Sequence, residues 1–346
     1  TTGACGTTWI ITPPALVADW TNGAPTALID AIIADDYNEA APITAKNLTI
    51  NTDIVLTIQA ANTLSVAGNL IINGSIVFES DATGTSSFGP YTGAAISGTG
   101  TTMVERYIPA SRAWRLLTAP LTGTTINTIS DNWQGANNEG LLLFSPAVFQ
   151  SQTMTGYVTG GTSPNIRKYN GGFQLINNLT TEPIFGALAT DTKPFLVFAT
   201  GASNSTAIVT GAAATTLRPS GQLITGTINH TSLAINTFHL LANPYASAID
   251  PVSLVANNTG QKLWLIDPSL GNFGAYATFD GANWTPTEPL GTDALIQSGT
   301  GFFVRSATAT SFEITESDKA SGSSDNWFVR NANTATNIDK IRILLY

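Results

Sequence analysis

Residues that could carry out catalysis or hold a transition metal are scarce in this chain of 346 residues. His230 and His239 are its only histidines, and they form neither a His-x-His nor an HExxH motif, so we expect no zinc site. Cys5 is the only cysteine, which excludes an intrachain disulfide. It is either a small buried thiol or a cross-chain contact near the N-terminus.

Calcium is the one metal for which the sequence offers candidate ligands. Asp267, Asp280 and Asp293 are evenly spaced in predicted loops, where carboxylate oxygens could bind Ca²⁺. None of them belongs to the dense acidic loop of an EF-hand or of a glycine-rich calcium repeat. Because Asp is also a common turn residue, turn formation is the interpretation we favour, and no cofactor is expected apart from this structural Ca²⁺.

No motif for enzymatic chemistry is recognisable. Glycan hydrolysis needs two carboxylates across the scissile bond, and the acidic residues are scattered without a pairing pattern. The chain also lacks a Gly-x-Ser-x-Gly nucleophile elbow and a Gly-x-x-x-x-Gly-Lys phosphate loop. We therefore predict no catalytic residues and no enzyme.

Three aromatic residues between 262 and 285 suggest a different kind of chemistry, the stacking of rings on sugars. Trp264, Tyr276 and Trp284 fall on adjacent predicted strands or at a hairpin tip. Exposed in a row on one sheet face, they would contact glycans as carbohydrate-binding modules do. The alternative is that Trp264 and Tyr276 are core residues at alternating strand positions. We expect Trp284, near the turn residue Gly281, to be the most exposed of the three.

The composition narrows the range of partners. Charged residues make up only 11% of the chain, and the formal net charge is −9. The 14 Lys and Arg residues form no basic patch, so nucleic acid is not an expected partner, and the acidity argues against anionic membrane surfaces. No apolar run is long enough to span a bilayer. The densest charge cluster, Glu105 with Arg106, Arg112 and Arg115, is expected to form ion pairs on a strand face.

The elements that position these residues are expected to be β-strands and turns, because threonine, glycine and asparagine are abundant. Between 43 and 79, short apolar segments recur every six to eight residues and alternate with Thr or Ser. This pattern predicts stacked short rungs, as in a β-solenoid, within residues 1–80, capped by the stretch that holds Trp9 and Trp20. Residues 26–37 fit either a helix or a strand. The recurring segments are 47–50, 55–58, 63–66, 69–72 and 75–78.

The rest of the chain changes character after a break. Residues 81–100 are rich in Gly, Ser and Thr and are predicted to be a linker. Residues 101–346 contain longer strands separated by turn signals, which favours a β-sandwich or jelly-roll module, with room for two sub-domains. MVERYI and AWRLLTAPL are predicted to form a hairpin-like pair around 109–112. Further strands are expected at 173–177, 194–200, 206–210, 222–229, 236–242, 262–266, 274–279, 301–305, 311–315 and 340–345. The predicted fold class is therefore all-β, a short N-terminal β-solenoid-like region followed by a β-sandwich or jelly-roll domain.

A family resemblance rests on residues 40–346. The run ITAKNLTINTDIVLTIQAANTLSVAGNLIINGSIVFE resembles the short repeat of large secreted surface proteins of Bacteroidota. Seven motifs similar to those of the β-rich module in that group follow in the expected order. They are VERYI, WRLLTAPL, ISDNWQGANN, FHLLANPYASAID, LWLIDPSLGNFGAYATFDG, IQSGTGFFVRS and FEITESDK.

The resemblance implies a location more than an activity. Proteins of this group are exported by the type IX secretion system and are displayed on the cell surface or released, and most are adhesin-like or structural. We therefore expect an extracellular or cell-surface protein whose leader has been removed. A C-terminal sorting domain normally follows such modules, whereas the ending 341–346 looks like the last strand of the module itself.

Two functional hypotheses follow, with a third in reserve. The first is a non-enzymatic structural protein, a filament or adhesin subunit that assembles through strand edges into a polymer or surface layer and meets host or cell surfaces. Its expected subunit contacts are Cys5, Trp9, Trp20, Ile341, Ile343, Leu345 and Tyr346. The second is a secreted protein that binds or cleaves carbohydrate, and the third is a viral tail or capsid protein. Solenoid polysaccharide lyases belong to the second, although five short rungs with one lysine, Lys46, are few for such an enzyme.

Overall fold

The fold consists mostly of strands and turns. The computed structural model describes residues 8–11, 20–21, 23–94, 96–123, 127–134, 140–186, 188–201, 212–286 and 295–320. Within these ranges the only α-helices are two short ones, α1 (Ile129–Trp133) and α2 (Pro251–Asn257), and η1 (Glu316–Asp318) is a single 3-10 turn. The described part of the chain is thus mainly β, as its composition predicts. No helix in these ranges has the length and apolar character that a membrane crossing requires.

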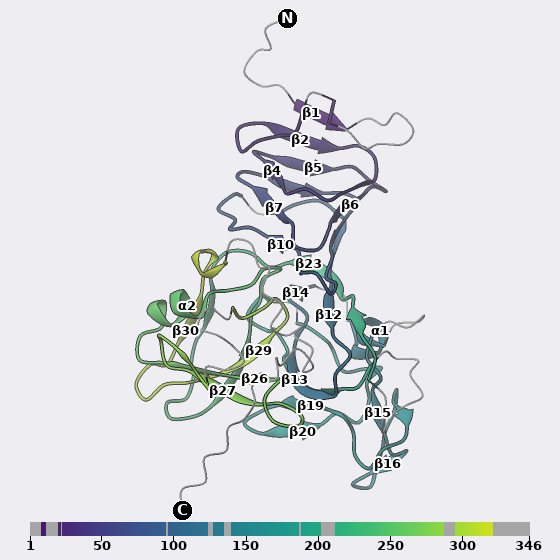
Figure 1. Ribbon diagram of the computed structural model, residues 1–346, viewed down its shortest axis with the longest axis vertical. Helices are drawn as coiled ribbons and strands as arrows, with labels where there is room; N and C mark the ends of the chain where they lie inside the picture. Colours follow the sequence, from purple (N-terminus) through teal and green to yellow (C-terminus); the bar gives the residue numbers. More distant parts are fainter. Residues whose placement is uncertain are drawn as a thin grey trace, which may run out of the picture.

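Three parallel sheets form the N-terminal region (Figure 1). From β2 to β10 the chain visits the three sheets in turn, so that each strand pairs in parallel with the strand three places later. We call one such circuit a coil and residues 8–104 the stack. The first sheet contains β1 (Thr8–Ile11), β2 (Asp30–Ile33), β5 (Leu48–Ile50) and β8 (Leu70–Ile72). The second begins with β3 (Tyr37–Glu39), β6 (Val55–Ile58), β9 (Ser75–Phe78) and β11 (Thr101–Val104), and the third contains β4 (Ile43–Ala45), β7 (Thr63–Val66) and β10 (Ser87–Phe88).

The core of the stack is built from columns of aligned apolar residues. Leu48 pairs with Ala31 on one side and with Leu70 on the other, and all three side chains are buried. Side chains two positions apart share a face of a strand, so Ile50 continues the inner column while Thr49 lies between the two on the other face. A short Leu-Thr-Ile segment cannot bury its apolar face alone, and the neighbouring coils supply the cover.

Two expectations about the stack need correction. The recurring segments are not successive rungs, because segments adjacent in sequence lie in different sheets and three of them make one coil. Residues 81–100 are not a simple linker, because they form β10 and bury Phe88 and Tyr91 in the core. The ambiguous stretch 26–37 resolves into β2 and the start of β3.

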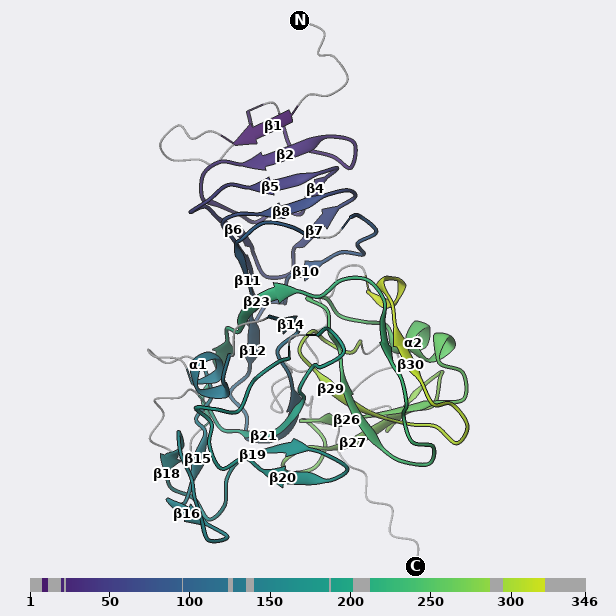
Figure 2. The same ribbon diagram turned by 180° about the vertical axis from the view of Figure 1, so that it is seen from behind.

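The stack continues directly into the remainder, residues 105–320, which we call the module. β11 pairs with β9 on one side and with β23 (Ser220–Leu223) on the other, and β14 (Leu121–Thr122) follows β23. One sheet therefore runs from the stack into the module. In both views the stack stands on the module with β1 at the far end (Figures 1 and 2).

Two larger sheets face each other in the module. Leu116, Ile266 and Phe303 are buried between them. A separate apolar core, which includes α2, covers the other face of the larger sheet. The smaller sheet contains β13 (Ala113–Leu117), β21 (Phe195–Ala199), β19 (Ile166–Tyr169) and β20 (Phe173–Leu175). The larger contains β25 (His239–Ala242), β29 (Gly301–Arg305), β26 (Lys262–Asp267), β27 (Ala275–Phe279) and β28 (Trp284–Thr285).

Short strand pairs complete the module. They are β12 (Arg106–Ile108) with β22 (Thr215–Leu217), β15 (Phe144–Ser145) with β18 (Val158–Thr159), β16 (Val148–Phe149) with β17 (Gln152–Thr153), and β24 (Ile228–His230) with β30 (Phe312–Ile314). Most predicted strands of the module are confirmed, although 222–229 is split between β23 and β24, while 206–210 and 340–345 lie outside the described residues. The predicted hairpin-like pair is wrong: β12 pairs with β22, and β13 pairs with β21.

Candidate functional site

An open pocket is lined by aromatic residues from both facing sheets and from the loop before β25. Its volume is about 320 Å³. Five rings line it, from Tyr169, Phe238, Trp264, Tyr276 and Phe303, and we call it the aromatic pocket.

Strand pairing brings most of these rings together. Trp264 on β26 lies opposite Phe303 on β29, and Tyr276 on β27 lies opposite Ile266 on β26. Trp264 and Ile266 are two positions apart and therefore share the sheet face that meets the smaller sheet. Tyr169 reaches the pocket from β19 of the smaller sheet.

Edge-to-face contacts hold the rings in fixed positions. The Phe238 and Trp264 ring centroids are 4.9 Å apart at 79°, and those of Tyr169 and Phe303 are 5.1 Å apart at 78°. The Tyr169 hydroxyl donates a hydrogen bond of 3.1 Å to the Phe238 carbonyl, which joins β19 to the loop before β25. Phe303 is buried and forms the floor, whereas Phe238 and Tyr276 are 43% and 47% exposed and form the rim. Two large exposed rings beside a pocket suit ligand contact better than core packing.

The two tyrosines keep their protons at neutral pH. Burial raises the pKa of the Tyr169 phenol, and burial followed by the nearby Tyr169 raises the pKa of Tyr276. Both groups are therefore neutral hydroxyls. Tyr276 can donate and accept hydrogen bonds at the pocket, whereas Tyr169 donates to the Phe238 carbonyl and can only accept.

The glycan-contact candidates divide into two groups. Trp264 and Tyr276 lie in the aromatic pocket, so the interpretation that both are core residues is wrong for the exposed Tyr276. Trp284, which we expected to be the most exposed, has an exposed fraction of 0%. It pairs with Phe279 across β27 and β28, and cross-strand partners share a sheet face. Phe279 faces the inner core, so Trp284 is buried against it with ring centroids 5.1 Å apart.

Three pocket residues are not among the sequence candidates. Phe303 has the pattern of a core residue, and Tyr169 and Phe238 lie far from the segment 262–285 in sequence. They join the pocket through antiparallel pairing and through the hydrogen bond between β19 and the loop before β25. No local signal in the sequence marks this association.

Two of the three calcium candidates, Asp267 and Asp280, accept hydrogen bonds within turns. The Asp267 carboxylate is buried and accepts hydrogen bonds from the backbone N–H and the hydroxyl of Ser269, at 2.8 and 2.6 Å. The Asp280 carboxylate accepts from the backbone N–H groups of Asn283 and Ala282, which lower its pKa. Asp293 lies outside the described residues. Within the described ranges no group of three or more His, Cys, Asp or Glu side chains could hold a metal ion.

The arginine cluster is buried more deeply than expected. Burial and the neighbouring Arg115 lower the pKa of Arg106 to about 9. Burial lowers the pKa of Arg115 to about 10, although the charge of Asp267 partly offsets this effect. Glu105 forms an ion pair with Arg218, which is outside the expected group, with 2.5 Å between Nε and Oε1. The prediction that these arginines lie on an exposed strand face is thus wrong for Arg106 and Arg115, which are interior residues.

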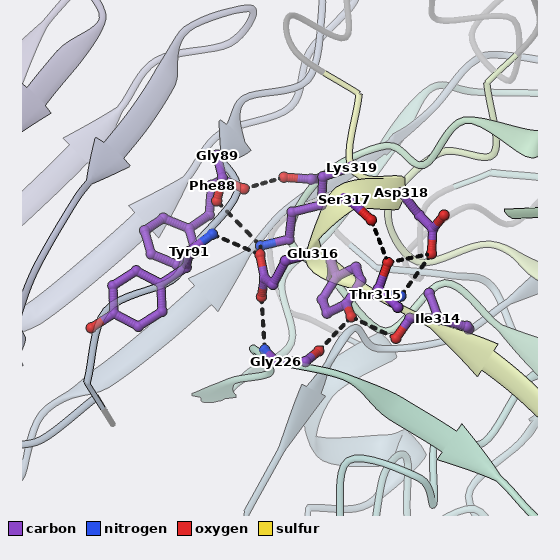
Figure 3. A network of polar contacts seen from close by, with 12 residues as sticks. Phe88, Gly89, Tyr91, Gly226, Ile314, Thr315, Glu316, Ser317, Asp318 and Lys319 are labelled. Atoms are coloured by element: carbon purple, nitrogen blue, oxygen red, sulfur yellow. Dashed lines mark hydrogen bonds and ion pairs between the residues drawn. The ribbon is translucent and has the colours of Figure 1, made fainter. Parts of the chain in front are cut away.

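A second polar cluster joins the stack to the end of the module (Figure 3). The fully buried Lys319 ammonium lies 2.8 Å from Glu316 Oε2 and donates to the Gly89 carbonyl at 3.3 Å. Glu316 Oε2 accepts the Tyr91 backbone N–H, and Glu316 Oε1 accepts the Gly226 backbone N–H, both at 2.8 Å. We call these five residues the polar junction.

Aromatic rings enclose the charge of the polar junction. The Lys319 ammonium lies 5.0 Å from the Phe88 ring centroid and 4.7 Å from that of Tyr245, both within cation–π range. Burial lowers the pKa of Lys319, and Glu316 counteracts this effect. Because its ammonium group is enclosed and bonded to both parts of the chain, Lys319 acts as a structural link and not as a nucleophile.

Most subunit-contact candidates lie outside the described residues. These are Cys5, Ile341, Ile343, Leu345 and Tyr346. Trp9 lies on β1, the outermost strand of the first sheet. The half-buried Trp20 stacks on Tyr37 with ring centroids 5.4 Å apart and donates its Nε1–H to the Tyr37 hydroxyl at 3.2 Å.

Comparisons with family models, with curated proteins and with solved structures find no match to this chain.

Proposed function

We propose that this chain is a non-enzymatic extracellular surface protein, a filament or adhesin subunit built as a short β-solenoid followed by a β-sandwich module. In this proposal the protein reaches the cell surface or the medium by type IX secretion. The observation that carries it is the parallel stack. Its outermost described strand, β1, lies at the end farthest from the module.

The edge of β1 supports assembly from end to end. Its four residues Thr8–Ile11 pair in register with β2, and β1 is the last strand of its sheet within the described ranges. A sheet edge is a template for another strand. A strand from a second copy, such as the C-terminal segment 337–346, would extend the sheet, and repeated head-to-tail contacts of this kind give open polymers.

Removal of the edge tests this proposal. The wild-type chain should form filaments or sheets in negative-stain electron microscopy and sediment as large species. Ile10→Pro removes a backbone donor from β1 and should leave particles of single-chain mass. Val252→Lys, at an exposed apolar position on α2, is the matched surface control and should assemble like the wild type. Monodisperse wild-type particles at all concentrations tested would refute assembly through this edge.

A second function, carbohydrate binding, is favoured by the aromatic pocket. Its rigid rings and its two neutral tyrosine hydroxyls supply the stacking surface and part of the hydrogen bonding that a sugar requires. The two functions are compatible, because an adhesin combines an assembling part with a binding part.

Alanine substitutions at the rim and on the wall test the second function. Tyr276→Ala and Trp264→Ala should each abolish detectable signals on a glycan array. Phe273→Ala removes an exposed ring that does not line the pocket and should leave the signals unchanged. An array on which the wild type gives no signal would eliminate carbohydrate binding.

A further inference from the structure

A second pocket has one lining residue, Tyr169, in common with the aromatic pocket. Its volume is about 200 Å³, and we call it the polar pocket. The rest of its lining combines apolar side chains with the charged side chains of Lys168 on β19 and of Glu182, Asp191 and Lys193 in the segment between β20 and β21.

The charges in the polar pocket cancel in pairs. Lys168 Nζ lies 2.8 Å from Glu182 Oε2, and Lys193 Nζ lies 3.0 Å from Asp191 Oδ1. All four side chains are partly exposed, so they keep free donor and acceptor positions toward solvent. A surface that offers both donors and acceptors without net charge suits hydroxyl groups, which donate and accept at the same atom, better than it suits an anion or a cation.

The aromatic pocket alone lacks what a sugar needs beyond stacking. Its lining consists of rings, and apart from the tyrosine hydroxyls and the indole N–H it offers little for hydrogen bonding. The exposed guanidinium of Arg305, 5.7 Å from the Phe238 ring centroid, places a positive charge at its rim. This charge disfavours a quaternary ammonium ligand, the other common guest of an aromatic cage.

We infer that the two pockets are adjacent subsites for one uncharged oligosaccharide, with one sugar ring stacked in the aromatic pocket and a following unit bonded in the polar pocket. This inference rests on the proposed carbohydrate binding. Tyr169 is common to the linings of both subsites, so one ligand that fills both would contact it. In the polar pocket, specificity for neutral units arises because Lys168 and Lys193 are each already compensated by a carboxylate.

A ladder of chain lengths tests the inference. The full chain is titrated by calorimetry with neutral glucose, xylose and mannose oligosaccharides of one to six units, and with acidic oligogalacturonates as the charged counterpart. For at least one neutral series the affinity should rise about tenfold or more between one unit and the length that fills both pockets, because the longer chain gains hydrogen bonds to charged groups. The oligogalacturonates should bind more weakly.

Three variants separate the subsites. Tyr276→Ala should remove binding at every length. Lys193→Met should lower the affinity for the longer chains about tenfold and leave single units within about twofold. Lys46→Met is the same change at an exposed position in the stack. It should alter neither the affinity for single units nor that for longer chains. Circular dichroism and thermal melting confirm that each variant is folded.

The outcomes distinguish the two levels of the proposal. If the wild type binds no saccharide in solution or on the array, carbohydrate binding fails and the inference fails with it. If the wild type binds saccharides and Lys193→Met binds each chain length as tightly as the wild type does, carbohydrate binding stands and the second subsite is refuted. Tighter binding of the oligogalacturonates would refute the preference for neutral chains.

Discussion

The stack and the module are both β-structure, but they differ in how far apart in sequence their paired residues lie. In the stack, Leu48 pairs with Leu70 in the next coil. In the module, Leu116 pairs with Leu196, and Arg106 pairs with Leu217. Repetition at short range makes each coil a copy of its neighbour, whereas pairing at long range lets unlike segments meet. Side chains of different chemistry therefore gather in the module.

The placement of polar groups follows the same division. The apolar core of the stack continues into the module as one cluster of buried side chains. The polar junction lies where Gly89 and Tyr91 of the stack meet Lys319 and Glu316 of the module. Buried arginines, the aromatic pocket and the polar pocket all belong to the module. A regular stack suits a spacer or an assembly element, and the irregular module suits recognition.

The largest effect is expected at the polar junction, where the two regions meet. Lys319→Met leaves the Glu316 carboxylate with two backbone donors and no cation in a site that is largely buried. Removal of one partner of a buried pair costs about 3–5 kcal/mol, so the free energy of unfolding should fall by about 4 kcal/mol. Denaturant titration followed by circular dichroism measures this change.

A double-mutant cycle isolates the pair. Lys319→Met combined with Glu316→Gln should cost less than the sum of the two single changes, because each single change leaves a lone charge and the double variant leaves none. Lys193→Met, in the exposed pair with Asp191, is the matched control and should cost less than about 1 kcal/mol. Equal costs at Lys319 and Lys193 would show that the junction does not hold the two regions together.

Truncation of one leucine in each region tests whether the stack behaves as a local repeat. Leu48 and Leu263 are both completely buried, and each change to Ala should cost about 3 kcal/mol. The pattern of amide protection should differ. Hydrogen exchange in Leu48→Ala should accelerate mainly in the coils next to it, and in Leu263→Ala across the sheet that contains β26. Identical exchange maps for the two variants would remove this distinction between the regions.

The sequence supports strand positions far better than strand partners. Alternation in the segments around Leu48 and Leu70 reveals which residues face inward, because that property is local. Partners depend on the path of the chain, so the pattern does not show that three segments make one coil or that β12 joins β22. The same limit applies to the pockets: Trp264 and Tyr276 are identifiable as neighbours within one hairpin, but Tyr169 arrives from another sheet. The prediction that Trp284 is exposed is wrong because the sheet face on which its side chain lies depends on the register of the β27–β28 pair.

Acid should weaken the module through His230. Burial lowers the pKa of this histidine to about 4, and among the described residues its Nε2 has no hydrogen-bond partner. Between pH 6.5 and 4 the unfolded chain binds a proton that the folded chain does not, so stability falls as the pH falls through this window, by at most about 3 kcal/mol. His230→Gln carries no titrating group and should lose this part of the pH dependence while matching the slope of the wild type above pH 7. Parallel profiles for the two proteins between pH 4 and 6.5 would contradict this expectation.

The smallest effect tests how closely successive coils approach each other. A Cβ added at Gly100 would lie 1.8 Å from the Gly74 carbonyl oxygen of the preceding coil, a backbone atom that cannot rotate away. A Cβ at Gly172, in the turn between β19 and β20 of the module, would meet nothing within 4 Å. Neither glycine has the positive φ that would itself penalise alanine, so the comparison isolates the steric contact.

Gly100→Ala should lower the free energy of unfolding by about 1–3 kcal/mol, as overpacking does, whereas Gly172→Ala should change it by less than about 1 kcal/mol. If Gly100→Ala melts like the wild type, the coils can separate at this corner, and tight spacing then does not distinguish the stack from the module.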